Sequence, residues 1–134
     1  MIRPCFLVVD REFPGSISTR KLVIETAKFN VLTAYSAEEA VELLKLFPAV
    51  SGVVIDDGIE EISTERLISE MKLLRANLPV VVVAAPGARM CHGADFQVRS
   101  FEPAKLLETL RSITPREAEE IEQRNETLSK EHLV

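Results

Sequence analysis

The sequence predicts a single α/β domain built on a parallel sheet that helices cover on both faces. Short apolar runs rich in β-branched residues alternate with segments of helical spacing along most of the 134-residue chain. These runs lack the polar alternation of a strand with one wet face, which is typical of parallel strands buried on both sides. A chain of this length fits one domain, in which folding buries roughly two-thirds of the surface that the unfolded chain exposes.

The first third of the chain predicts a strand, a helix and a second strand. FLVV (6–9) is a short apolar run that stops at charged residues and Pro14. The segment 16–30 has loosely helical apolar spacing, and VLTAY (31–35) follows it as a strand. The apolar positions of the helix are Ile17, Leu22, Ile24, Ala27 and Phe29.

The second predicted helix has a clear start and end. Ser36 and Glu39 have the spacing of a capping box, and Pro48 ends the helix. Its apolar face comprises Ala40, Val41, Leu43, Leu44 and Phe47.

The middle of the chain predicts a strand, a third helix and the central strand. GVVID (52–56) leads into an acidic loop, after which Ser63 or Thr64 caps a helix. That helix presents Leu67, Ile68, Met71 and Leu74, and PVVVVAA (79–85) follows it.

The next connection is unusually short. AAPGARMCHG (84–93) is too brief and too rich in Gly and Pro for a full helix, so we expect a shortened fourth helix. A weak strand, DFQVRSF (95–101), follows. Glu102 and Pro103 then open a helix that bears Leu106, Leu107, Leu110 and Ile113.

The tail 114–134 is a separate, polar segment after a domain that we place at 1–113. Thr114, Pro115 and Glu117 predict an extra C-terminal helix. Ala118, Ile121, Asn125 and Leu128 fall on one heptad-like stripe, in which Asn125 is a polar position that could fix the register of a coiled coil. A solvated terminal helix, a homodimer through this or the last domain helix, and a linker to another domain all remain open.

Composition and charge exclude several functions. The net charge of −5 disfavours direct nucleic-acid binding, which needs clustered Lys and Arg. No apolar run approaches the ~20 residues of a membrane-spanning helix, and no signal peptide is visible. We therefore expect a cytoplasmic protein that uses neither membrane nor nucleic acid.

The two cysteines, Cys5 and Cys91, lack the spacing of a zinc site or a disulfide framework. We expect Cys5 to be a small buried residue at the start of the first strand. Cys91 precedes His92, and such a pair could act as a nucleophile with its base, although no third group that orients them is evident.

Two apolar runs end on carboxylates. Asp10 follows FLVV (6–9), Asp56 ends GVVID (52–56), and Asp57 comes directly after it. The carboxyl ends of parallel strands share one edge of the sheet, where ligands bind in open α/β folds. This acidic edge needs a counter-charge, and Arg11 follows Asp10 directly.

The succession VVDRE, VVID, PVVVVAA, GADF and a closing amphipathic helix resembles the receiver domain of bacterial response regulators, over residues 4 to about 113. The resemblance implies a flavodoxin-like, doubly wound sheet of five parallel strands in the order 2-1-3-4-5. It also implies a signalling domain, not an enzyme, that accepts a phosphoryl group from a histidine kinase onto an aspartate with the help of Mg²⁺.

By that resemblance, Asp56 is the phosphoacceptor, or Asp57 after a slip of one residue, and Asp10 and Asp56 are metal ligands. Ala84 stands where a switching Ser or Thr is usual, and Arg99 stands for the usual lysine. Ser100 replaces the proline that usually follows this lysine. The aromatic switch residue of the family corresponds to either Phe96 or Val98.

Arg11 replaces the second carboxylate of the family's acidic pair. A guanidinium there removes a metal ligand and adds positive charge where the ion would sit, which disfavours the Mg²⁺ binding that the resemblance implies. We hypothesise that Arg11 pairs with Asp56 or Asp10 as an internal counter-charge. The alternative is that Arg11 points into solvent.

These departures favour a degenerate receiver that works as a protein-interaction module with a histidine kinase or another signalling protein. A working phosphoacceptor, in which Glu12 or Asp57 supplies the missing ligand, is the first alternative. The second is a small flavodoxin-like enzyme or ligand binder that uses Asp10, Asp56 and the Cys91–His92 pair.

Overall fold

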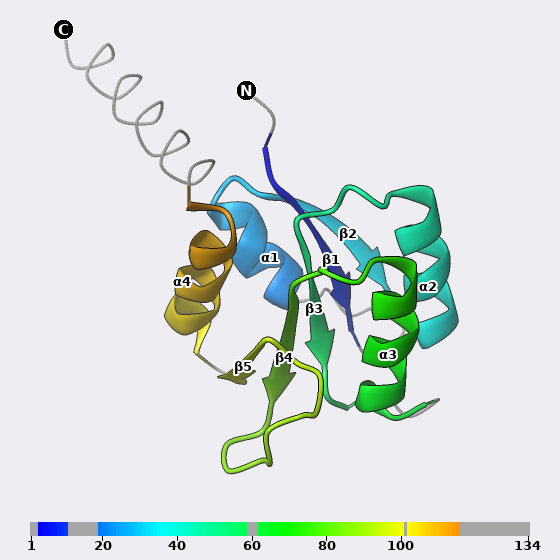
Figure 1. Cartoon of the computed structure of the whole chain (residues 1–134). Coiled ribbons are helices and arrows are strands. Elements are labelled where there is room, and N and C mark those ends of the chain that lie inside the picture. Colours follow the sequence, from blue (N-terminus) through cyan, green and yellow to red (C-terminus); the bar gives the residue numbers. More distant parts are fainter. Residues whose placement is uncertain (1–2, 11–18, 59–61, 101, 116–134) are drawn as a thin grey trace, which may run out of the picture.

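The computed structural model describes residues 3–10, 19–58, 62–100 and 102–115. Within them, five parallel strands form one sheet in the order β2-β1-β3-β4-β5, which confirms the predicted fold class (Figure 1). The strands are β1 (Cys5–Val9), β2 (Asn30–Ala34), β3 (Gly52–Asp56), β4 (Val80–Ala84) and β5 (Phe96–Arg99). The helices are α1 (Thr19–Thr26), α2 (Ala37–Leu46), α3 (Thr64–Leu74) and α4 (Pro103–Ile113).

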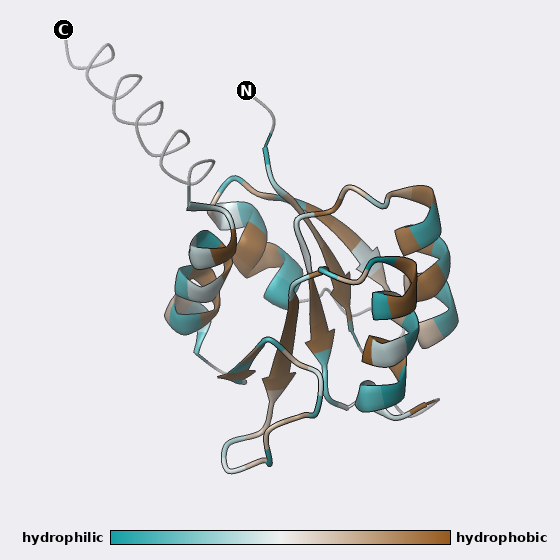
Figure 2. Ribbon diagram, viewed as in Figure 1, coloured by the Kyte–Doolittle hydropathy of each residue, from teal (hydrophilic) through white to brown (hydrophobic). Residues whose placement is uncertain are grey.

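Alternate side chains of the strands supply two separate cores, one on each face of the sheet. On one face, Leu7, Val53 and Val82 pack with residues of α2 and α3. On the other, Phe6, Val54, Val81 and Val83 pack with residues of α1 and α4. Figure 2 shows the result: the central strands are apolar except at the end of β3, and the helices are apolar on one side.

Two serine residues cap the N-termini of α2 and α3. The Ser36 hydroxyl accepts a 3.0 Å hydrogen bond from the Glu39 N–H at the start of α2. The Ser63 hydroxyl does the same for the Arg66 N–H of α3, so Ser63 is the cap and not Thr64.

Three apolar residues that the helical patterns assigned to the core are exposed. Leu22, Phe47 and Leu74 have 49%, 49% and 46% of their surface accessible. Phe47 and Leu74 lie at the C-terminal ends of their helices. In α1 the two residues after Leu22 face the core instead, with Val23 partly and Ile24 fully buried.

No helix connects β4 to β5 among the described residues 85–95, so the fourth helix, which was predicted to be shortened, is absent there. Side chains hold this connection instead. The Gln97 Oε1 atom accepts from the Cys91 N–H, and its Nε2 atom donates to the Arg89 carbonyl. Asp95 accepts hydrogen bonds from the Val80 N–H and Lys72.

Thr114 is the residue that ends α4. It is buried, and its hydroxyl donates to the Leu110 carbonyl. Of the predicted C-terminal segment 114–134, the structure describes only Thr114 and Pro115, so the stripe of the predicted helix lies outside the described residues. In the part that the structure describes, no helix is long and apolar enough to cross a membrane.

Candidate functional site

Asp10 and Asp56 meet at the carboxyl edge of the sheet. The register pairs Val9 of β1 with Ile55 of β3, so the following residues, Asp10 and Asp56, are also side by side. Both carboxylates lie on the α1 side of the sheet, two residues beyond Val8 and Val54 of that core. Both residues are buried, with 7% and 4% of their surface exposed, so their charge needs a partner.

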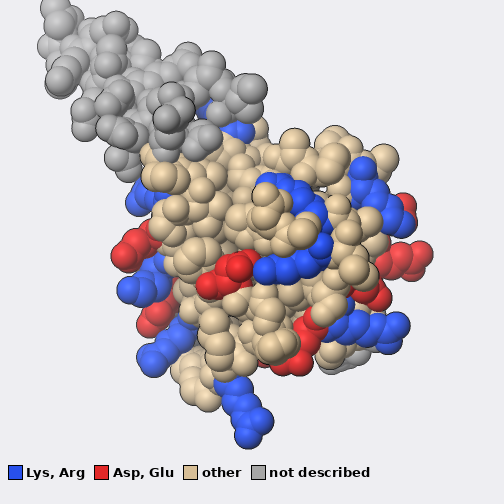
Figure 3. Space-filling model, viewed as in Figure 1, with Lys and Arg blue, Asp and Glu red and all other residues tan. Residues whose placement is uncertain are grey.

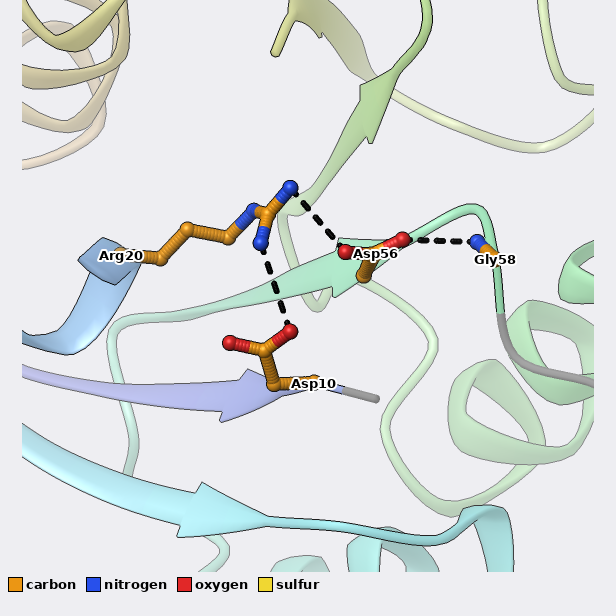
Figure 4. Close-up of polar contacts among 4 residues, drawn as sticks. All are labelled: Asp10, Arg20, Asp56 and Gly58. Atoms are coloured by element: carbon orange, nitrogen blue, oxygen red, sulfur yellow. Dashed lines mark hydrogen bonds and ion pairs between the residues drawn. The ribbon is translucent and has the colours of Figure 1, made fainter. Parts of the chain in front are cut away.

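Arg20 supplies that partner from the first turn of α1 (Figure 4). Its Nη1 atom lies 3.3 Å from Asp10 Oδ1, and its Nη2 atom lies 3.0 Å from Asp56 Oδ2. Only 22% of the Arg20 side chain is exposed. One guanidinium therefore bridges the two buried carboxylates, each from a different nitrogen, and ties α1 to β1 and β3.

The second oxygen of Asp56 is also engaged. Its Oδ1 atom accepts a 2.7 Å hydrogen bond from the Gly58 N–H, in the loop that follows β3. Asp57, the alternative acceptor, is exposed and bonds elsewhere, because its Oδ1 atom accepts from the Thr64 hydroxyl of α3. The structure thus places Asp56 beside Asp10 and directs Asp57 toward α3.

The bridge gives the acidic edge a counter-charge, but from Arg20 and not from the predicted residue Arg11. Arg11, the predicted counter-charge, and Glu12 lie outside the described residues. The available signal for Arg20 was topological, since a helix that follows a strand in such a sheet begins at the strand's carboxyl edge. A basic residue in the first turn of that helix can reach carboxylates at the strand ends.

The described residues do not fit a magnesium ion. Mg²⁺ requires near-octahedral oxygen ligation at short distances. Here a guanidinium stands between the two candidate carboxylates, and no group of three His, Cys, Asp or Glu among the described residues could hold a metal. Arg20 provides the positive charge that a cation would otherwise bring.

Ala84 and Arg99 are paired neighbours at the ends of β4 and β5. Ala84 is buried and offers no hydroxyl, whereas the Arg99 side chain is exposed. The Ser100 N–H continues the strand pairing by donating to the Ala84 carbonyl. Of the two candidate aromatic positions, Phe96 is 37% exposed and Val98 is buried in the core beneath α4.

The Cys91–His92 pair is remote from this site. Cys91 packs against the core beneath α2 and α3, on the face opposite to that of Asp10 and Asp56. Burial, with the negative charges of Glu65 and Asp57, raises the pKa of the Cys91 thiol and so disfavours the nucleophilic thiolate. The structure therefore brings together no Cys–His–Asp constellation among its described residues.

Figure 3 shows basic and acidic side chains on one face of the molecule, with a group of basic atoms near its centre that acidic atoms border.

No protein-family model and no curated protein matches this sequence. Solved structures do match its fold. A response regulator from Chloroflexus aurantiacus is 23% identical with a TM-score of 0.73, covering 86% of this chain and 100% of its own. A receiver domain protein from Clostridium thermocellum is 20% identical with a TM-score of 0.70, covering 93% and 98%.

A third match carries ligands. The response regulator protein TrrA from Thermotoga maritima, in complex with Mg²⁺ and BeF, is 25% identical with a TM-score of 0.65, covering 82% of this chain and 98% of its own. All three neighbours span nearly their whole length in the match, and the sheet order agrees with the one that the resemblance implied. The chain has the flavodoxin-like fold of response regulator receiver domains.

Proposed function

We propose that this chain is a degenerate receiver domain of a two-component system, which binds signalling partners without phosphoryl transfer to Asp56. The observation that carries the proposal is the Arg20 guanidinium, which bridges Asp10 and Asp56 at 3.3 and 3.0 Å. A receiver site that is built for phosphorylation needs those carboxylates for a metal ion. Here their charge is already compensated from within the chain.

Three further features support a closed site. One Asp56 oxygen accepts from the Gly58 N–H while the other faces Arg20, so both oxygens are engaged. Ala84 offers no hydroxyl to a phosphoryl oxygen at the end of β4. The connection after β4 has no helix, which removes a surface that could respond to phosphorylation.

The proposed partners are a histidine kinase or another signalling protein in the cytoplasm, with no direct role for nucleic acid or membrane. Contact through α4 or the C-terminal segment to a second copy is part of this proposal. Such docking would be the output of the domain, and no enzymatic step is assigned to it.

A working phosphoacceptor is the second candidate, and one observation favours it. Asp56 is buried at the end of β3 beside Asp10, on the sheet edge that carries ligands in such folds. TrrA, which shares the fold, is in complex with Mg²⁺ and BeF. In this candidate function Arg20 would have to swing off both carboxylates before Mg²⁺ and a phosphoryl group could enter.

Labelling with acetyl phosphate separates the two candidates. The full chain is incubated with acetyl phosphate and magnesium, and its intact mass is followed, with Asp56→Asn as the matched control and an active receiver as the positive control. We expect no phosphoryl adduct on the wild-type chain. An adduct that forms on the wild type and is absent from Asp56→Asn would establish the phosphoacceptor and refute the degenerate receiver.

A further inference from the structure

A cavity of about 410 Å³ opens between α1 and α4, beyond the ends of β4 and β5. The two helices lie side by side on one face of the sheet, and both begin near its carboxyl edge (Figure 1). The volume falls in the range of sites for small molecules. None of the functions considered so far uses this cavity.

The inner surface of the cavity is mostly apolar. Val83 of β4 and Val98 of β5 form its floor, and both are almost fully buried in the core beneath α1 and α4. Val23 of α1 and Leu106 of α4 contribute to the walls. Such a surface favours a compact apolar body.

One hydrogen-bond donor in the lining lacks an acceptor among the described residues. Arg20 lines the cavity, and in the part of the chain that the structure describes its buried Nε atom has no hydrogen-bond partner, although its two terminal nitrogens contact Asp10 and Asp56. In Figure 4 both dashed lines from Arg20 leave its terminal nitrogens and none leaves Nε. A buried N–H without an acceptor costs free energy, which a ligand oxygen that reaches this atom from the cavity would recover.

The charges around the cavity favour a neutral acceptor over an anion. Arg20 and Arg99 are the described cations of the lining, and Glu102 is its carboxylate. Asp10 and Asp56 already balance Arg20. Among the described residues, these two guanidinium groups and three carboxylates leave a formal charge of −1, so a ligand carboxylate would gain little from them together.

We propose that this cavity binds a small, uncharged, largely apolar molecule through a carbonyl oxygen that accepts a hydrogen bond from Arg20 Nε. Amides, ketones and esters belong to this class. The binding would rest on the α1–α4 cavity and not on phosphorylation, so it stands or falls separately from the function of Asp56.

Three probes that share a phenyl ring test the proposal by NMR on the full chain. Acetophenone carries a carbonyl, ethylbenzene lacks an acceptor, and benzoate carries a negative charge. We expect acetophenone to shift the Arg20 Nε–H and the amides of Val98 and Leu106 saturably, with a Kd of about 1 mM. Ethylbenzene and benzoate should each bind at least about fivefold more weakly.

Two substitutions in α1 locate the binding. Val23→Phe fills the cavity from a half-buried position and should weaken acetophenone at least about tenfold. Leu22→Phe adds a ring at the neighbouring exposed position, outside the lining, and should leave the affinity unchanged. Both variants keep Arg20 and its carboxylates.

Each remaining outcome would overturn the proposal. Absence of saturable shifts at the lining residues would show that the cavity does not bind such molecules. Ethylbenzene binding as tightly as acetophenone would remove the role of Arg20 Nε. Tighter binding of benzoate would assign the cavity to anions, and equal losses in Val23→Phe and Leu22→Phe would place the binding elsewhere.

Discussion

Arg20 is the residue on which the proposed function depends, because it compensates two buried carboxylates that belong to different strands. Removing one member of a buried charge cluster leaves the others without compensation, which is far more costly than losing a surface ion pair. Arg20 also fixes the start of α1 over the ends of β1 and β3. Its role can be tested without any ligand.

Arg20→Ala should lower the free energy of unfolding by about 3 to 5 kcal/mol, because Asp10 and Asp56 lose their counter-charge. Urea unfolding measures the loss. The matched control is Arg66→Ala, which removes an exposed pair with Glu70 on α3 and should cost no more than about 0.5 kcal/mol. Equal losses in the two variants would mean that the bridge contributes nothing beyond a surface contact.

Cys91 gives a prediction with a definite dependence on pH. Burial comes first among the causes that raise the pKa of its thiol, followed by the charges of Glu65 and Asp57. A raised pKa delays formation of the thiolate to higher pH, so alkylation by iodoacetamide should rise at higher pH than for an ordinary thiol. In a Cys5→Ala background, Glu65→Gln should move this rise to lower pH.

The control for that shift is Glu70→Gln on the same helix, which is not among the groups that perturb Cys91. A rise at the same pH in Glu65→Gln and Glu70→Gln would contradict the electrostatic part of the explanation.

The sequence placed the two carboxylates but not the cation between them. Asp10 and Asp56 could be predicted because each directly follows an apolar strand, and strand ends share an edge. The sequence could not show that Arg20 faces these carboxylates, because the apolar spacing of 16–30 leaves the first residue of α1 uncertain by several positions. A shift of one residue rotates a helical side chain by ~100°, enough to turn it away from the site.

At the scale of elements, the connection between β4 and β5 is the main departure from a regular alternation of strands and helices. Gln97 of β5 holds it through two hydrogen bonds, at 2.7 Å to the Cys91 N–H and 2.9 Å to the Arg89 carbonyl. A loop without helical hydrogen bonds depends on such side-chain contacts for its order.

Gln97→Ala should speed hydrogen exchange at the Cys91 amide by about tenfold, because the amide loses its acceptor. Gln97→Glu is the matched control, since it keeps an acceptor for Cys91 and loses only the donor to Arg89. Amide-resolved exchange by NMR measures both. If the rates of Gln97→Ala and wild type agreed, the loop would be held by other contacts.

The strands and helices could be predicted from the apolar patterns and the helix caps. Short β-branched runs identified the strands, and Ser36 marked the start of α2 where the structure has its cap. The patterns overestimated the buried faces at Leu22, Phe47 and Leu74. Spacing alone cannot tell how far a neighbouring element extends, so it assigns to the core residues that nothing covers.

At the scale of the whole molecule, the pattern predicted a parallel sheet but not its strand order. Alternating strands and helices with right-handed crossovers are compatible with several orders. The order β2-β1-β3-β4-β5 came from the resemblance to receivers, and the structure has it. This order sets β1 beside β3, and thereby Asp10 beside Asp56, so the site follows from the topology.

The measurement that tests the closed site most directly is an amide-resolved NMR titration of the full chain with millimolar magnesium and then beryllofluoride, repeated on Asp56→Asn. Because Arg20 bridges the carboxylates, we predict no saturable shifts localised around Asp10, Asp56 and Ala84 in the wild type. Saturable shifts there that vanish in Asp56→Asn would show that the site admits the metal and the phosphoryl mimic, and would contradict the degenerate receiver.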